Sequence, residues 1–436
     1  MFKRITMASV RLVERWLPDP YVLVLVLTLI TFIAGMLIGN TPLQMVDHWG
    51  TGFWNLLSFT MQMVLILVTG WVLASTVFFR RILEGVSALT HTPGQAIIAV
   101  TLVGLTASWI NWGFGLVIGA MAARQIARRV PTVDYRLLIA SAYSGFLVWH
   151  GGLAGSVPLT IATEKHFLAD QIGVIPTSTT IFSGYNLGIV LALFIIVPIV
   201  NRMMMPDKQN TITVDPSKLI DEPEIERSDN ETPAEKLENS VLLSLAVGIM
   251  GVVFALYYFI AKNGGLNLNI VNFMFLMLGI LLHGRPSRLL KSVDSAARGS
   301  AGIIIQFPFY AGIMGMMLHS GLAEVISNWF VAISTTTTLP LFTFLSAGLV
   351  NIFVPSGGGQ WAVQGPIMIQ AAQQLGADLS KVAMAVAWGD AWTNMIQPFW
   401  ALPALAIAGL RAKDIMGFCL IILIVSGIVI GVGLVL

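Results

Sequence analysis

The chain has 436 residues, of which 56% are hydrophobic and 11% are charged, and its mean hydropathy is +0.81. Because a soluble domain carries roughly 25% charged residues, this composition excludes a soluble globular protein and predicts one all-α polytopic membrane unit. The net charge is +2, and we expect the lipid bilayer, but no nucleic acid, as a partner. The single cysteine, Cys419, excludes an intramolecular disulfide and a cysteine metal cluster.

A first membrane repeat is expected at residues 21–205, after a basic segment, residues 1–20, that suits an N-terminal interfacial helix. Its crossing segments are predicted at 21–40, 52–78, 137–163 and 184–205. The first two are joined by a loop that contains Asp47 and His48. Residues 82–93 are too short and too polar to cross, and are predicted to lie in the membrane interface.

The segment 95–123 is apolar but is interrupted at residues 108–115, SWINWGFG. Basic residues flank it on both sides, with Arg81 before it and Arg124 after it, so the chain enters and leaves on one side of the membrane. Each arm has only about 12–14 apolar residues, which is short for a crossing. We therefore predict a re-entrant helical hairpin, with two crossing spans as the alternative.

Residues 206–238 are acidic and hydrophilic, and are predicted to be a solvated linker without chemistry. An extra connecting span follows at 239–262, and a second membrane repeat at 263–436. Its crossing segments are predicted at 268–284, 300–320, 381–410 and 415–435, with a basic loop at 285–298 and a re-entrant hairpin at 340–375.

The tip of the second hairpin is predicted at residues 351–366, NIFVPSGGGQWAVQGP. Pro355 and the three glycines that follow Ser356 do not continue a helix comfortably, yet apolar segments flank them. Such backbone is tolerated at membrane depth only where it is buried in protein or lines a cavity. Helix ends and free N–H groups at this tip would hold a small anion or a dehydrated cation. An ordinary loop between two spans is the alternative.

The positive-inside rule orients this arrangement. If neither hairpin crosses and the N-terminus is cytoplasmic, only Lys165, Lys262 and Lys381 of the 24 lysines and arginines fall outside. This asymmetry predicts nine full spans, with the N-terminus inside and the C-terminus outside.

The two halves share the same order of segments, at one constant offset that relates Gly113 to Gly358 and Tyr143 to Trp388. Because one extra span separates the copies, the second is expected to be inverted. Two inverted repeats, each with a re-entrant hairpin and a broken transmembrane helix, are the architecture of a secondary transporter whose site lies near the membrane midplane.

Four interruptions are expected to converge, at 108–115, 150–156, 356–360 and 389–398. None contains lysine or arginine, so an anionic substrate would be bound by helix N-termini, amides and hydroxyls. The candidate substrate-binding residues are Asn111, Gly113, Gly115, Ser356, Gly357, Gly358, Gly359 and Gln360. For Asn111, a helix cap is the structural alternative.

Asp390 is an ionisable residue inside an interrupted span, and such residues are functional candidates. It would take up a proton or, with Thr393 and Asn394, ligate Na⁺; no other metal and no cofactor is expected. A solvated position near the outer interface, a few residues past Lys381, is the structural alternative. His150 is a further coupling candidate as a proton relay, with a hydrogen-bonded histidine at a helix break as its alternative.

Enzymatic motifs are not found in the sequence. VPSGGG lacks the setting of an intramembrane serine protease, an aspartyl protease needs a second carboxylate, and the GGG run has no Walker lysine. We therefore do not expect an enzyme. An uncoupled anion channel is the alternative to a carrier.

The stretches RWLPDP, GFWNLLSFTMQM, INWGFGLVIGAM, VPSGGG and QPFWALPALAIAGL resemble the bacterial short-chain fatty acid transporter family, over essentially the whole chain. The resemblance implies a secondary active transporter of the bacterial cytoplasmic (inner) membrane that moves acetoacetate, butyrate or related monocarboxylates with H⁺ or Na⁺.

The family is similar to a larger superfamily of carboxylate carriers, which are commonly dimeric, so the resemblance also implies a homodimer. A di- or tricarboxylate carrier is the alternative. Carriers of that superfamily often have Ser-Asn-Thr at the hairpin tips, where this chain has SWINWG and VPSGGG, so their sodium-site pattern is not matched.

Overall fold

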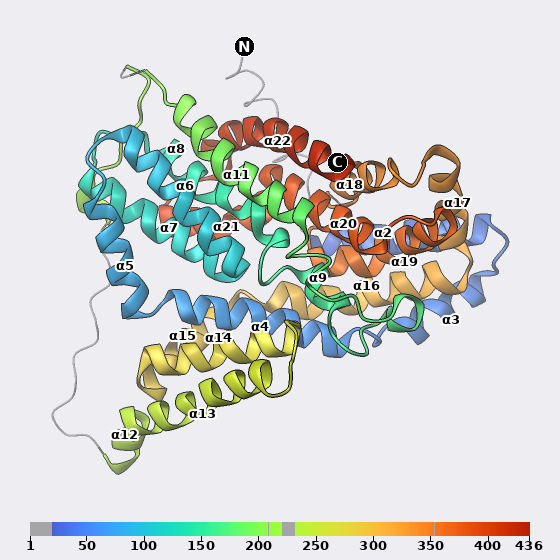
Figure 1. Ribbon diagram of the computed structural model, residues 1–436, viewed down its shortest axis with the longest axis horizontal. Helices are drawn as coiled ribbons and strands as arrows, with labels where there is room; N and C mark the ends of the chain where they lie inside the picture. The colour runs from blue at the N-terminus through green and yellow to red at the C-terminus, as the bar shows by residue number, and fades with distance from the viewer. Residues whose placement is uncertain (1–19, 208, 220–231, 353) are drawn as a thin grey trace.

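The computed structural model describes residues 20–207, 209–219, 232–352 and 354–436. Within these residues all regular elements are helices (Figure 1). The interfacial helix predicted for residues 1–20 lies, except for its last residue, outside the described part of the chain.

The first half contains α2 (Pro20–Leu37), α3 (Pro42–Gly52), α4 (Leu57–Ala74), α5 (Val77–Ala88), α6 (Pro93–Ile110), α7 (Trp112–Arg129), α8 (Tyr135–Ser144), η1 (Gly145–Gly151), α9 (Ser156–Ile161), α10 (Ala169–Ile172) and α11 (Gly184–Met203). The linker region contains η2 (Pro216–Leu219) and α12 (Pro233–Glu238). The second half contains α13 (Val241–Ile260), α14 (Leu268–His283), α15 (Pro286–Arg298), α16 (Ala301–His319), α17 (Leu322–Ile333), α18 (Leu339–Val350), α19 (Gly357–Leu375), α20 (Leu379–Thr393), η3 (Asn394–Ile396), α21 (Pro398–Ala408) and α22 (Ala412–Val435).

Two segments predicted as loops are helices. The loop with Asp47 and His48 is α3, which begins with a capping box between Thr41 and Gln44 and has Pro42 in its first turn. The basic loop at 285–298 is α15, which also begins with a proline. Both helices are stabilised by neighbours from the other half, because α3 packs on α16 and α15 packs on α4.

Each predicted hairpin is a pair of helices separated by a short break. In the first pair only Asn111 separates α6 from α7, and both arms have 18 residues. The expectation of an arm too short to cross was therefore wrong for α6, whereas α7, whose apolar run ends at Arg124, is not among the described helices that are apolar enough to cross. Whether this pair is re-entrant stays a prediction. In the second pair α18 ends at Val350 and α19 begins at Gly357, with residue 353 of the predicted tip outside the described residues. The glycines at 357–359 form the first turn of α19 rather than a loop.

Both predicted broken helices are interrupted. The first continues from α8 into η1, leaves helical geometry at residues 152–155 and resumes as α9. In the second, the helical conformation continues to Thr393, so the break begins at Asn394 and not at Gly389 as predicted. Gly389 instead allows close contact with α18: a methyl group there would lie 2.9 Å from the backbone nitrogen of Gly348.

The helices of the first half recur in the second at a nearly constant spacing. Counted between first residues, six pairs of helices are separated by almost the same number of residues. The pairs are α3 and α15, α4 and α16, α5 and α17, α6 and α18, α7 and α19, and α8 and α20. The contact of Gly348 with Gly389 has a counterpart in the first half, where a methyl group on Gly145 would overlap the backbone of Gly104. The two halves therefore share an order of elements and a close helix contact.

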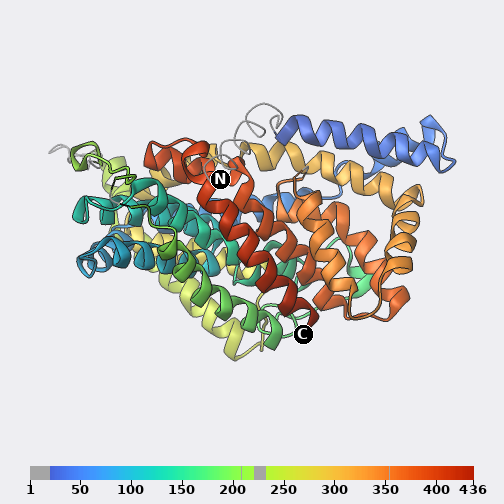
Figure 2. The same cartoon turned by 90° about the horizontal axis from the view of Figure 1, so that it is seen from above.

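The two halves exchange helices. α2 and α3 of the first half pack on α16, whereas α14 and α15 of the second half pack on α4; Figure 2 shows α2 running beside α16. α13 lies at the edge of the molecule beside α14 (Figure 1). Since α4 and α16 also contact one another, the exchange joins both halves into one body.

Seven helical segments of the described chain are long and apolar enough to cross a membrane: α4, α6, α8 to α9, α11, α12 to α13, α16 and α22. Six of them coincide with predicted spans. The predicted spans at α2, α14 and α20 to α21 are shorter or interrupted, and α6 was predicted as a hairpin arm. The multi-pass class is thus supported, while the number of nine spans and the orientation stay predictions.

Part of the predicted solvated linker is attached to the first half. The backbone N–H of Ile212 donates to Oδ2 of Asp134 at 2.8 Å, and the N–H of Tyr135 donates to the carbonyl of Ile212 at 2.9 Å. Leu219 is buried against the fold. Residue 208 and residues 220–231 of the linker lie outside the described residues.

Candidate functional site

The carboxylate of Asp390 lies in the interior of the protein, where the residue is 0% exposed. Its Oδ2 lies 3.6 Å from Nδ1 of His150 and 3.4 Å from the side-chain amide of Asn394. Within the described chain, Oδ1 accepts no hydrogen bond. Its burial excludes the alternative of a solvated residue, although Lys381, at the partly exposed start of the same helix, is close in the sequence.

His150 belongs to η1 of the first broken helix and is also 0% exposed. Its Nδ1 lies 2.6 Å from the carbonyl oxygen of Ala387. Because a carbonyl oxygen only accepts, we infer that Nδ1 carries the proton and that Nε2 of the neutral ring is an acceptor. Nε2 has no hydrogen-bond partner among the described residues. His150 and Asp390 thus form a buried pair that joins the two broken helices.

The first turn of α19 lies against this pair. Ser356 caps the helix, with its Oγ accepting from the N–H of Gly359 at 3.4 Å. A methyl group on Gly357 would overlap the ring of His150, and one on Gly358 would lie 2.7 Å from Phe59. Only glycine permits this close approach, which places the first turn of α19 against the unbonded edge of His150.

The candidate residues of the first hairpin are engaged in structural contacts. Oδ1 of Asn111 accepts from the N–H of Phe114 at 3.0 Å and its Nδ2 donates to the carbonyl of Ile66 at 3.4 Å, so Asn111 caps α7. A methyl group on Gly113 would lie 3.1 Å from the carbonyl oxygen of Leu67, and one on Gly115 would overlap Ser108. These glycines allow α7 to pack closely on α4 and α6.

Asn351, which the sequence analysis did not select, links the second hairpin to the second broken helix. Its Nδ2 donates to the carbonyl of Asp390 at 2.8 Å and to Oγ1 of Thr393 at 2.9 Å. It also lies 2.9 Å from the side-chain amide group of Asn394. Nδ2 therefore joins three groups of α20 and its break. The sequence contained a signal for Asn351, because it is the first residue of the predicted hairpin tip, residues 351–366.

Gln360 is fully buried beside this network. Its Nε2 donates to the carbonyl of Ala347 at 2.8 Å and to the side chain of Gln364 at 2.9 Å. Within the described residues, the side-chain oxygens of Gln360 and Asn351 accept no hydrogen bond. Together with Oδ1 of Asp390, they make three buried acceptor oxygens that have no donor.

An aromatic wall extends from His150 to the first hairpin. The ring of Trp149 lies 3.5 Å from that of His150 and 5.9 Å from that of Trp112, the first residue of α7. Trp400 of α21 and Phe146 complete the cluster, with ring centroids 5.4 Å from Trp112 and 5.6 Å from Trp149 respectively. A small acid at the first turn of α19 would therefore meet an apolar surface for its tail.

The described residues contain no group of three or more His, Cys, Asp or Glu side chains that would hold a metal ion. This arrangement can instead bind a small anion, exchange a proton at His150 or Asp390, or present oxygen atoms to an alkali cation.

Comparisons with known proteins cover the whole chain. The profile of the family described as short chain fatty acid transporter matches residues 1–436. A protein of Escherichia coli (strain K12) that carries the name of a short-chain fatty acid transporter is 48% identical over 439 residues, which is 100% of both chains. A Haemophilus influenzae protein with the same name is 45% identical over 444 residues, which is 100% of this chain and 99% of that protein.

Two solved structures have a similar fold. The YdaH transporter of Alcanivorax borkumensis superposes with a TM-score of 0.58 at 16% identity, covering 95% of this chain and 98% of that one. MtrF of Neisseria gonorrhoeae, which illustrates a class of antimetabolite efflux pumps, superposes with a TM-score of 0.53 at 13% identity, covering 99% and 97%. At these identities the likeness concerns the fold alone.

Proposed function

The chain belongs to the short-chain fatty acid transporter family, and from this premise we propose that it is a secondary active transporter of small monocarboxylates. Acetoacetate and butyrate represent the substrate class, and the site of action is the bacterial cytoplasmic membrane. The observation that carries the proposal is the unbonded Nε2 of buried His150 facing the first turn of α19. Relatives are named as transporters, and an enzymatic role is not proposed.

Alternating access follows from inverted repeats. The recurrence of helices at a nearly constant spacing supports two copies of one unit. If α13 is the extra span between them, an odd number of crossings separates the copies whether or not the first hairpin crosses, so the second copy is inverted. Opposed helix breaks from two such copies would place the binding site near the midplane, and rocking of the copies would expose it to each side in turn.

Substrate binding is assigned to the first turn of α19. The N–H groups of Gly357 and Gly358, and the partial positive charge of the helix end, would hold the carboxylate. Nε2 of His150 is an acceptor, so a carboxylate beside it requires a proton between the two. The substrate therefore binds with one proton, held between its carboxylate and Nε2 of His150. Asp390, 3.6 Å from the other ring nitrogen, would compensate the charge of the protonated ring, and the short tail contacts Trp149 and its aromatic neighbours.

Sodium is the second candidate for the coupling ion. A buried carboxylate needs neutralisation, and no described lysine or arginine lies within salt-bridge distance of Asp390. The unbonded oxygens of Asp390, Asn351 and Gln360 are the hard ligands that Na⁺ prefers. Both ions act through Asp390, and only transport measurements separate them.

The decisive experiment is uptake of radiolabelled butyrate into proteoliposomes, with proton and sodium gradients imposed independently. We expect an inward proton gradient to drive accumulation in the wild type, and Asp390→Asn to abolish that accumulation. Asp47→Asn, an exposed residue of α3, is the matched control and should accumulate butyrate normally.

The other outcomes identify the alternatives. Accumulation driven by sodium alone would assign the coupling ion to Na⁺. Rapid equilibration without any gradient, unchanged by Asp390→Asn, would indicate an anion channel. Stronger competition by citrate than by acetoacetate would indicate a di- or tricarboxylate carrier. The homodimer is part of the proposal, and the mass of the detergent-solubilised protein measures it.

A further inference from the structure

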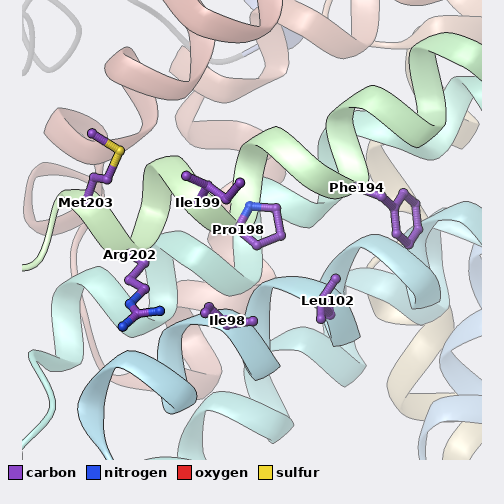
Figure 3. A pocket seen from close by; sticks show the side chains of 7 residues that line it. All are labelled: Ile98, Leu102, Phe194, Pro198, Ile199, Arg202 and Met203. Atoms are coloured by element: carbon purple, nitrogen blue, oxygen red, sulfur yellow. The ribbon is translucent and has the colours of Figure 1, made fainter.

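Figure 3 shows a groove between α6 and α11 whose lining includes no residue of the candidate site. Its volume is about 490 Å³. Leu102 of α6 and Phe194, Pro198 and Ile199 of α11 line it, and Arg202 lies toward one end in Figure 3. The lining is apolar except for this arginine.

The position of the groove determines what fills it. Leu102 is 38% exposed and Ile199 is 52% exposed, and both belong to helices long and apolar enough to cross a membrane. Pro198 has no N–H to donate to the carbonyl of Phe194, which favours a bend in α11 where the groove lies. A lipid-facing groove of this kind is filled by acyl chains rather than by water.

Arg202 gives the groove a charge preference. It is exposed in the last turn of α11, where a long basic side chain reaches the level of the lipid headgroups. Its guanidinium lies along α6, since a methyl group on Gly94 would be 3.3 Å from Nε. It forms no salt bridge with a carboxylate of the described residues. A guanidinium pairs well with a phosphate, which it contacts through two N–H groups.

We propose that this groove is a binding site for one anionic phospholipid, with its phosphate on Arg202 and an acyl chain along Leu102, Phe194 and Pro198. α11 follows the broken helix α8 to α9 and contacts α6, α8 and η1, so the lipid occupies the outer side of the helices that hold His150. The site is independent of the transported substrate.

Native mass spectrometry of the full chain tests this site. The protein is equilibrated with equal amounts of phosphatidylglycerol and phosphatidylcholine that carry the same acyl chains. We expect one phosphatidylglycerol to be retained in preference to phosphatidylcholine, and Arg202→Gln to reduce that preference about fivefold, the effect of one basic residue at an anionic lipid surface. Leu102→Trp, which fills the groove and keeps the charge, should lower retention of both lipids.

Arg81→Gln is the matched control, because Arg81 is exposed on α5 and outside the groove. It should keep the wild-type preference. The proposal is overturned if Arg202→Gln retains phosphatidylglycerol as the wild type does, or if Arg81→Gln loses it equally. Palmitate provides a further test. If it displaces the lipid from the wild type but not from Arg202→Gln, the phospholipid proposal is overturned and the groove is assigned to a free fatty acid.

Discussion

The hydroxyl of Tyr143 donates a hydrogen bond of 2.6 Å to the backbone carbonyl of Asn394. Tyr143 belongs to the first broken helix, and Asn394 begins the break of the second. Trp388, the equivalent of Tyr143 in the second half, makes the reciprocal connection: its Nε1 donates to Asn186 at 3.0 Å, and Asn186 donates to the carbonyl of Gly151 at 3.1 Å. Each broken helix therefore donates a hydrogen bond, directly or through Asn186, toward the backbone near the break of the other.

Replacement of Tyr143 by phenylalanine should destabilise this junction. The carbonyl of Asn394 would lose its short hydrogen bond while still buried, at a cost of about 1–3 kcal/mol. We expect a lower Tm of the purified protein by scanning fluorimetry and slower butyrate uptake. Tyr257→Phe is the control, because Tyr257 is 53% exposed. Equal Tm values for the two variants would contradict a structural role for the Tyr143 hydroxyl.

Gly357→Ala should impair transport. The added methyl group would overlap His150, so the first turn of α19 and the imidazole must separate. A misplacement of this size in a binding site lowers activity by about 10- to 100-fold, and we expect that loss in initial rates of butyrate uptake.

Gly188→Ala provides the comparison, since Gly188 lies within α11 and a methyl group there meets nothing within 4 Å. It should transport at the wild-type rate. Full activity of Gly357→Ala would refute the assignment of the carboxylate to this helix end.

Asn111 offers a test of capping against substrate contact. Asn111→Ala should lose about 1 kcal/mol of stability, because the N–H of Phe114 loses its acceptor. Asn111→Ser keeps a good cap but loses the long hydrogen bond from Nδ2 to the carbonyl of Ile66, so its Tm should lie between those of Asn111→Ala and the wild type. If both variants keep the wild-type Tm but lose butyrate binding, the side chain contacts the substrate and the capping interpretation is wrong.

His166 should make the loop between α9 and α10 sensitive to acid. Its Nδ1 accepts from the N–H of Leu168 at 3.2 Å, and its Nε2 lies 2.8 Å from the carbonyl of Gly173, so the folded loop uses the neutral ring. Burial, only partly offset by the hydrogen bond to Gly173, lowers the pKa of His166 from its ordinary value of 6.5. The unfolded chain then binds the proton more tightly than the folded chain.

The stability that the neutral ring of His166 contributes to the folded loop is present above pH 6.5. It is lost as the pH falls through the lowered folded-state pKa. We expect faster hydrogen exchange of residues 162–173 at pH 5 than at pH 7.5, after correction for intrinsic rates. His166→Gln should reduce the difference, whereas His91→Gln, at an exposed residue before α6, should preserve it. An identical difference in all three proteins would exclude His166 as the cause.

The sequence by itself determined the membrane class, the family and two of the places where helices are interrupted, Asn111 and Ser356. Composition is enough for the first, because a chain with 11% charged residues cannot cover a soluble surface. The breaks at Asn111 and Ser356 follow from local chemistry, since both residues cap the helix that comes next. The constant offset between the two halves was also visible, because it depends on the order of segments and not on contacts.

Only the tertiary structure decided which polar atoms are engaged and which remain without a partner. His150 and Asp390 belong to different halves of the chain, and their pairing depends on how two broken helices pack. Asn111 became a cap with both amide ends bonded, whereas Nε2 of His150 stayed unbonded among the described residues. The residues at 357–359 form the first turn of a helix, and they are glycines because neighbouring rings occupy the space that side chains would need. Packing between segments distant in the sequence determines which of these groups are bonded and where glycine is required. Local helix propensity carries no information about that packing.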